Sequence, residues 1–99
     1  MNLVNMFKAL ANPKRLEILA LLKEPEKFFA NERCEIKNGG VCLKSIERKI
    51  GLSQSTVSHY INLLYQAQLI EIERFGQWSY CKLNSETLKL LNKEISNMF

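Results

Sequence analysis

The sequence predicts a mainly α-helical domain with one small β-hairpin, and three features of the chain support this. Apolar residues recur at spacings of three and four on both sides of Gly51, as in amphipathic helices. The pattern changes to partial alternation over residues 69–74 and 78–83, which flank the short turn Phe75-Gly76-Gln77. The 99 residues make one domain, and 46% of them are hydrophobic, as in a globular protein. The expected order is four helices, two strands and a last helix (α-α-α-α-β-β-α).

Two helices are expected before residue 24. The apolar residues of a short amphipathic first helix are Leu3, Val4, Phe7 and Leu10. Asn12-Pro13 ends this helix, and Pro13 suits the first position of the next one. In the second helix, a stripe to be buried is formed by Leu16, Leu19 and Ala20. The apolar face is widened by Ile18, Leu21 and Leu22.

Residues 23–40 form an insertion between the second helix and the next helical pattern. This segment holds Pro25, the pair Phe28-Phe29, Cys34 and Asn38-Gly39-Gly40. It is longer than the ~2–8 residues that usually connect two helices. We expect a connection with one short helical turn around Phe28, and its length leaves room for a role of its own.

The segment from Gly51 to His59 is typical of a helix-turn-helix motif. Leu43, Ile46 and Ile50 predict the first helix, Gly51 ends it, and Ser53 caps the next helix. That recognition helix is expected to bury the stripe Val57, Ile61 and Leu64. Polar residues off the stripe, near the helix start, suit contacts to base edges and phosphates. These candidate DNA contacts are Gln54, Ser55, Thr56, Ser58 and His59.

The hairpin over residues 69–83 has the length of a wing beside a helix-turn-helix. Its polar residues Arg74, Gln77 and Lys82 are candidates to reach the DNA backbone or minor groove, and the alternative is that they are solvated surface groups. The aromatic residues Phe75, Trp78 and Tyr80 more often pack a hairpin than stack on bases. Asn84 or Ser85 is expected to cap the last helix, whose apolar face is formed by Leu88, Leu91, Ile95 and Met98.

Charge and composition limit the classes of function that this chain is expected to have. The net charge of +4 and the pI of about 9.1 suit an anionic partner such as nucleic acid. The start of the chain lacks the apolar segment of a signal peptide, and no apolar run has the length of a membrane span, so a cytoplasmic protein is expected. No catalytic pair or phosphate-binding loop is recognisable, so neither an enzyme nor a cofactor is expected.

Four pieces of the chain together carry a family resemblance. They are residues 10–19 (LANPKRLEIL), residues 51–59 (GLSQSTVSH), Leu63-Leu64 with residues 67–70 (AQLI), and the hairpin up to Tyr80. This combination resembles the winged helix-turn-helix repressors of the arsenic-repressor (ArsR/SmtB) family. The resemblance implies a homodimer built from the first and last helices. It also implies binding of a palindromic operator, from which a small molecule, a metal or a redox change releases the repressor. The alternative is a winged-helix protein-interaction module without specific operator binding.

The sensor sites of that family are incomplete in this chain. Cys42 matches the first of the paired cysteines of the arsenic sensors, but Lys44 stands at the second position. The last helix has no histidine, and His59 is the only histidine of the chain. We therefore expect no metal site of either kind. Cys34 and Cys42 remain candidates for a thiol switch or a soft-metal site. The alternative is that Cys42 is a small buried side chain and Cys34 an exposed one without a role, and Cys81 on the second strand is expected to be a packing residue.

Overall fold

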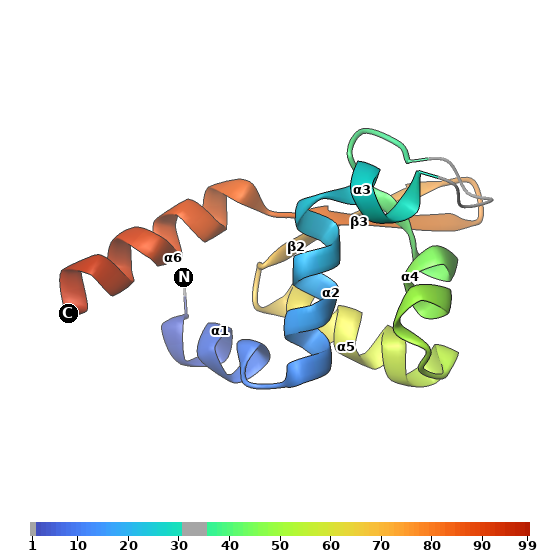
Figure 1. Cartoon of the computed structure of the whole chain (residues 1–99). Coiled ribbons are helices and arrows are strands. Elements are labelled where there is room, and N and C mark those ends of the chain that lie inside the picture. The colour runs from blue at the N-terminus through green and yellow to red at the C-terminus, as the bar shows by residue number, and fades with distance from the viewer. Residues whose placement is uncertain (1, 31–35) are drawn as a thin grey trace.

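The structure is a computed structural model that describes residues 2–30 and 36–99. Its elements follow the order α1 (Leu3–Leu10), α2 (Pro13–Lys23), α3 (Pro25–Phe29), β1 (Val41–Cys42), α4 (Leu43–Ile50), α5 (Gln54–Gln66), β2 (Ile70–Phe75), β3 (Trp78–Leu83) and α6 (Ser85–Met98). Figure 1 shows α1 to α5 and the strands gathered into one body, from which α6 projects with the C-terminus at its far end.

Helix starts are set by local side chains. The Oδ1 atom of Asn12 accepts hydrogen bonds from the backbone N–H groups of Lys14 and Arg15, at 2.9 and 3.0 Å, and Pro13 occupies the first turn. Ser53 and Asn84 cap α5 and α6 in the same way. Such caps satisfy N–H groups that have no partner within the helix, so they define where each helix begins.

The sheet has three strands in the order β1-β3-β2, where the sequence predicted a two-stranded hairpin. β2 and β3 form the expected antiparallel hairpin, and β1 adds to the other edge of β3, with Val41 opposite Cys81. β1 was missed because two residues carry no periodic pattern. The extra strand attaches the end of the 23–40 insertion to the wing and leads directly into α4.

The core lies between α2, α4, α5 and the sheet. Ile18 and Leu22 are the buried residues of α2, so the predicted stripe of Leu16, Leu19 and Ala20 is wrong. Leu16 is 50% exposed, Leu19 is only partly buried, and Ala20 is exposed. α2 is apolar around much of its circumference, and the elements packed against it select the inner face.

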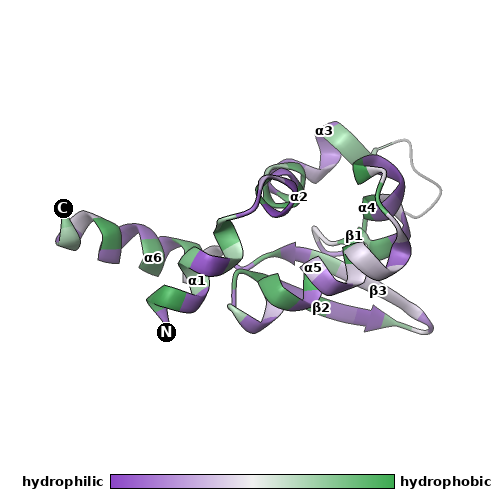
Figure 2. Cartoon of the chain, turned by 90° about the horizontal axis from the view of Figure 1, so that it is seen from below, coloured by the Kyte–Doolittle hydropathy of each residue, from purple (hydrophilic) through white to green (hydrophobic). Residues whose placement is uncertain are grey.

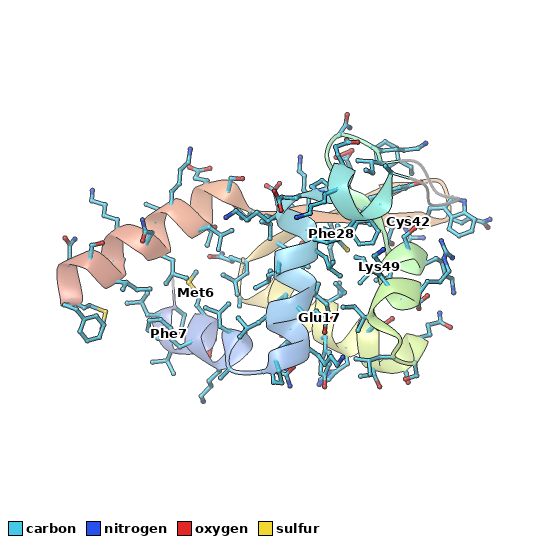
Figure 3. The ribbon with its side chains drawn as sticks, in the orientation of Figure 1. Met6, Phe7, Glu17, Phe28, Cys42 and Lys49 are labelled. Carbon is cyan, nitrogen blue, oxygen red and sulfur yellow. The ribbon has the colours of Figure 1, made fainter. Side chains whose placement is uncertain are left out.

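The inner face of α1 also differs from the expected one. Met6 and Ala9 are buried, whereas Val4 and Phe7 are 61% and 38% exposed. Figure 3 shows Met6 in the space between α1 and α6. The first helix is therefore apolar on two sides, of which only one faces its own core.

Arg15 joins α1, α2 and α5. Its Nε donates to the carbonyl oxygen of Ala9 at 2.6 Å, and its Nη2 donates to that of Lys8 at 3.1 Å. Its guanidinium carbon lies 5.2 Å from the centroid of the Tyr60 ring on α5. The cation therefore satisfies carbonyl groups at the C-terminal end of α1 and stacks on the recognition helix.

The insertion contains the short helical turn expected around Phe28, which is α3. Its later part, residues 37–40, folds against the wing. The Nζ atom of Lys37 lies 5.1 Å and 5.8 Å from the ring centroids of Phe75 and Tyr80. The Nδ2 group of Asn38 donates to Oε1 of Glu73 at 3.4 Å. Residues that precede the helix-turn-helix therefore contact the wing and help to hold it in place.

Cys42 and Cys81 are both buried, and Cys34 lies outside the described residues. Burial, with a smaller contribution from Cys42, raises the pKa of the Cys81 thiol to about 12. A thiol must ionise to react or to bind a metal, so Cys81 acts as a packing residue, as expected. Cys42 lies at the junction of β1 and α4 (Figure 3), where its burial favours the packing alternative over sensing.

None of the helices in the described ranges is both long and apolar enough to cross a membrane.

The burial of the two cysteines predicts low thiol reactivity in the native protein. In a Cys34→Ser variant at about pH 8, we expect neither Cys42 nor Cys81 to react with Ellman's reagent on the timescale of an exposed thiol. The same variant unfolded in guanidinium chloride should release the colour of both thiols. Rapid reaction of either thiol in the folded variant would show that the sheet opens at that residue. Rapid reaction of Cys42 would also support its role as a sensor.

Candidate nucleic-acid interface

The helix-turn-helix is formed by α4, the turn at residues 51–53, and α5. Gly51 ends α4 with φ of 75°, a left-handed conformation that favours glycine, and its N–H donates to the carbonyl of Glu47. Val57, Ile61 and Leu64 are buried, which confirms the predicted stripe of the recognition helix. This burial leaves the opposite side of α5 exposed.

The exposed side of α5 carries most of the predicted DNA contacts. Gln54, Ser55, Ser58 and His59 are all exposed within the first two turns. Side chains three and four residues apart share a helix face, so Ser55, Ser58 and His59 form one polar surface. Asn62 extends this surface by another turn and is also exposed. It was missed because it lies beyond the helix start, although the same spacing of three and four would have found it.

Thr56 has a different environment from the other candidates. It is partly buried, and its backbone N–H donates to Oγ of Ser53 at 3.2 Å. The Ser53 hydroxyl in turn donates to Oγ1 of Thr56 at 2.9 Å. The structure therefore uses Thr56 in the cap of α5, and a contact from Thr56 to DNA stays a prediction.

The three candidates on the wing lie at different heights along the hairpin. Arg74 and Gln77 are exposed near the turn at Gly76. Lys82 lies at the base of the hairpin opposite Glu71, and its Nζ is 3.8 Å from Oε2 of that residue. The structure thus does not bring Lys82 to the wing tip, and its partner carboxylate offsets its charge.

His59 does not belong to a metal site in the described part of the chain. Among residues 2–30 and 36–99, no group of three or more His, Cys, Asp or Glu side chains is arranged to hold a metal ion. A structural zinc site needs about four such ligands. The described residues place His59 on the exposed polar face of α5, and a contact from His59 to DNA stays a prediction.

Comparison with known proteins agrees with this geometry. No model of a known protein family matches the chain. Over 86 residues the chain is 42% identical to an uncharacterized HTH-type transcriptional regulator of Bacillus subtilis, YbzH, and the match covers 86% of each protein. It is 35% identical to the arsenical resistance operon repressor of the same organism, with 94% of this chain and 77% of the repressor covered.

Solved structures share the fold. The crystal structure of the ArsR family transcriptional regulator RHA00566 matches with a TM-score of 0.74 at 17% identity, over 97% of this chain and 84% of that one. The homodimeric winged helix-turn-helix DNA-binding domain of Mb0332 from Mycobacterium bovis matches with a TM-score of 0.69 at 24% identity, over 96% of this chain and 76% of that one. The chain therefore belongs to the arsenic-repressor (ArsR) family of winged helix-turn-helix transcriptional regulators.

Proposed function

We propose that this regulator is a homodimeric repressor that binds a palindromic operator through α5 and is released by an inducer. The observation that carries the proposal is the division of α5 into a buried apolar stripe and an exposed polar surface of Ser55, Ser58, His59 and Asn62. A recognition helix needs this division, because one side must be held by the domain while the other enters the major groove. The relatedness to a repressor of an arsenical resistance operon supports repression.

Dimerisation is proposed through α1 and α6. Leu91 is the only residue of α6 that is buried, and Leu90 and Met98 are 49% and 53% exposed. Figure 2 shows apolar residues recurring along α6, most of which lies outside the body. Val4 and Phe7 add exposed apolar area on α1. Several exposed apolar side chains on the same helices are typical of an interface between subunits, and the structure of Mb0332 is that of a homodimeric domain.

Two copies of α5 in such a dimer would lie about 34–36 Å apart and contact two half-sites of a near-palindrome. The wing would add contacts to the backbone through Arg74 and Gln77. Lys82 is proposed only as a weaker contributor, since it pairs with Glu71 at the base of the hairpin.

The recognition surface is tested by Ser58→Glu. An operator is first selected from random DNA duplexes with the wild-type protein. We expect Ser58→Glu to lose at least about 100-fold in operator affinity, because the carboxylate replaces a favourable contact and repels phosphates. The matched control is Ser85→Glu, the same change at the exposed first residue of α6. Both variants should keep the wild-type helical content and unfolding midpoint. Normal operator binding by Ser58→Glu would show that another surface contacts the bases.

The wing is tested by the salt dependence of binding. Arg74→Gln should weaken binding to all duplexes alike and reduce the slope of log affinity against log salt by about 0.9, the loss of one phosphate contact. Lys82→Gln, which removes the same charge five residues beyond the turn, should change the slope less. A changed sequence preference with an unchanged slope in Arg74→Gln would contradict a backbone role.

The dimer interface is tested by introducing charge at exposed apolar residues of α1 and α6. Leu90→Glu on α6, and Phe7→Glu on α1, should shift the protein from dimer to monomer in sedimentation at micromolar concentration. Leu16→Glu on α2 is the control, since Leu16 and Leu90 are 50% and 49% exposed. If both interface variants sediment as the wild-type dimer, then α1 and α6 do not form the interface.

A further inference from the structure

A cavity of about 270 Å³ lies where α1, α2 and α5 meet. Its polar walls come from the three helices: Asn5 and Lys8 from α1, Arg15 from α2, and Gln66 from α5. Asn5 lies nearly opposite Phe7 around α1, whereas Lys8 shares a face with Val4, which stands four residues before it. The cavity therefore borders the apolar surface proposed for dimerisation, which includes Val4.

The charge of this cavity favours an anion. Lys8 and Arg15 are cations, Asn5 and Gln66 carry amide N–H donors, and none of the described residues that line the cavity carries a carboxylate. The larger groove beside the wing, of about 790 Å³, differs in this respect. Its walls include Glu71 and Glu73 as well as two lysines, so its charge does not select a ligand of one sign.

Arg15 retains donors for a ligand. A guanidinium group has five N–H donors, and the described residues use one on the carbonyl of Ala9 and one on that of Lys8. Three N–H groups are left, and an arginine fork matches a carboxylate or a phosphate. The remaining wall of the cavity is apolar and includes Leu63 and Ala67. The ligand that fits is an oxyanion on a small apolar body.

From this arrangement we propose that the cavity binds a small organic acid, with its carboxylate on Arg15 and Lys8 and its apolar part against Leu63 and Ala67. The volume lies just below the ~300–1,000 Å³ of pockets for drug-sized ligands, which limits the acid to about one ring. The second part of the proposal rests on the proposed function: such a ligand would also alter operator affinity. Arg15 bonds to the end of α1 and stacks on Tyr60 of α5. A carboxylate bound to the Arg15 guanidinium would therefore change the contacts that connect α1, the proposed dimer helix, to the recognition helix.

Binding is tested on the free protein, so the result is independent of any DNA activity. Benzoate is titrated into isotope-labelled protein, with benzylamine as a cationic probe of similar size and shape. We expect saturable shifts of the Arg15 Nε–H signal and of the Leu63 and Ala67 amide signals with benzoate and none with benzylamine. No saturation with benzoate, or equal shifts with benzylamine, would overturn the site.

Variants locate the bound acid without disturbing the Arg15 hydrogen bonds. Lys8→Gln removes a cation at an exposed position, and Gln66→Glu places a carboxylate on the wall. Each should weaken benzoate binding by about fivefold or more, since a charged hydrogen bond or a repulsion is involved. Lys23→Gln, the same loss of charge at the other end of α2, should leave the affinity within about twofold. Equal affinities in all variants would place the benzoate elsewhere and reject the site.

The effect on DNA is measured separately, with the selected operator and with a random duplex. Saturating benzoate should change operator affinity by about 5–150-fold, and Gln66→Glu should reduce this response at a given benzoate concentration. If benzoate weakens both duplexes alike and Lys8→Gln lowers the salt slope, the cavity holds a DNA phosphate, and the effector role is overturned. If the wild type binds no duplex at all, the proposed function fails while the result on the free protein stands.

Discussion

The contacts of Arg15 constrain the whole DNA-binding unit. One guanidinium group bonds to two carbonyl oxygens at the end of α1 and stacks on Tyr60 of α5, while its backbone begins α2 under the cap of Asn12. α1 therefore cannot turn relative to the recognition helix without losing charged hydrogen bonds and exposing polar groups at a helix end. A lysine could supply the charge but not the planar fork that reaches two carbonyls and a ring at once.

The parts of the fold that could be predicted from sequence are those set by local chemistry. Asn12-Pro13, Gly51 and Ser53 determine helix ends through their own backbone and side-chain preferences, and each lies where the pattern indicated. The inner faces of α1 and α2 could not be predicted, because both helices have more apolar residues than one face can hold. Ile18 rather than Leu16 is buried because of what packs against it, and that information is not local. β1 likewise exists only through its pairing with β3.

In the candidate site, too, some features follow from the local sequence and others depend on contacts between elements. The exposed polar residues of α5 follow from the 3.6-residue period, and the same period also contains Asn62, which the emphasis on the helix start overlooked. The pairing of Lys82 with Glu71 depends on the register of the hairpin, which places the two residues opposite each other. The roles of Thr56 and Arg15 depend on hydrogen bonds that have no counterpart in a pattern of polar and apolar letters. Family membership could be inferred from the sequence because residues 10–19 and 51–59 resemble the family's motifs directly.

The attachment of residues 37–40 to the wing leaves little room for a side chain at position 40. Gly40 lies so close to the sheet that a Cβ atom there would approach the Lys37 carbonyl oxygen to 3.1 Å and the Cβ of Tyr80 to 3.2 Å. A side chain at position 40 would therefore displace Lys37 or Tyr80 and, through the pairing of β1 with β3, shift the start of α4.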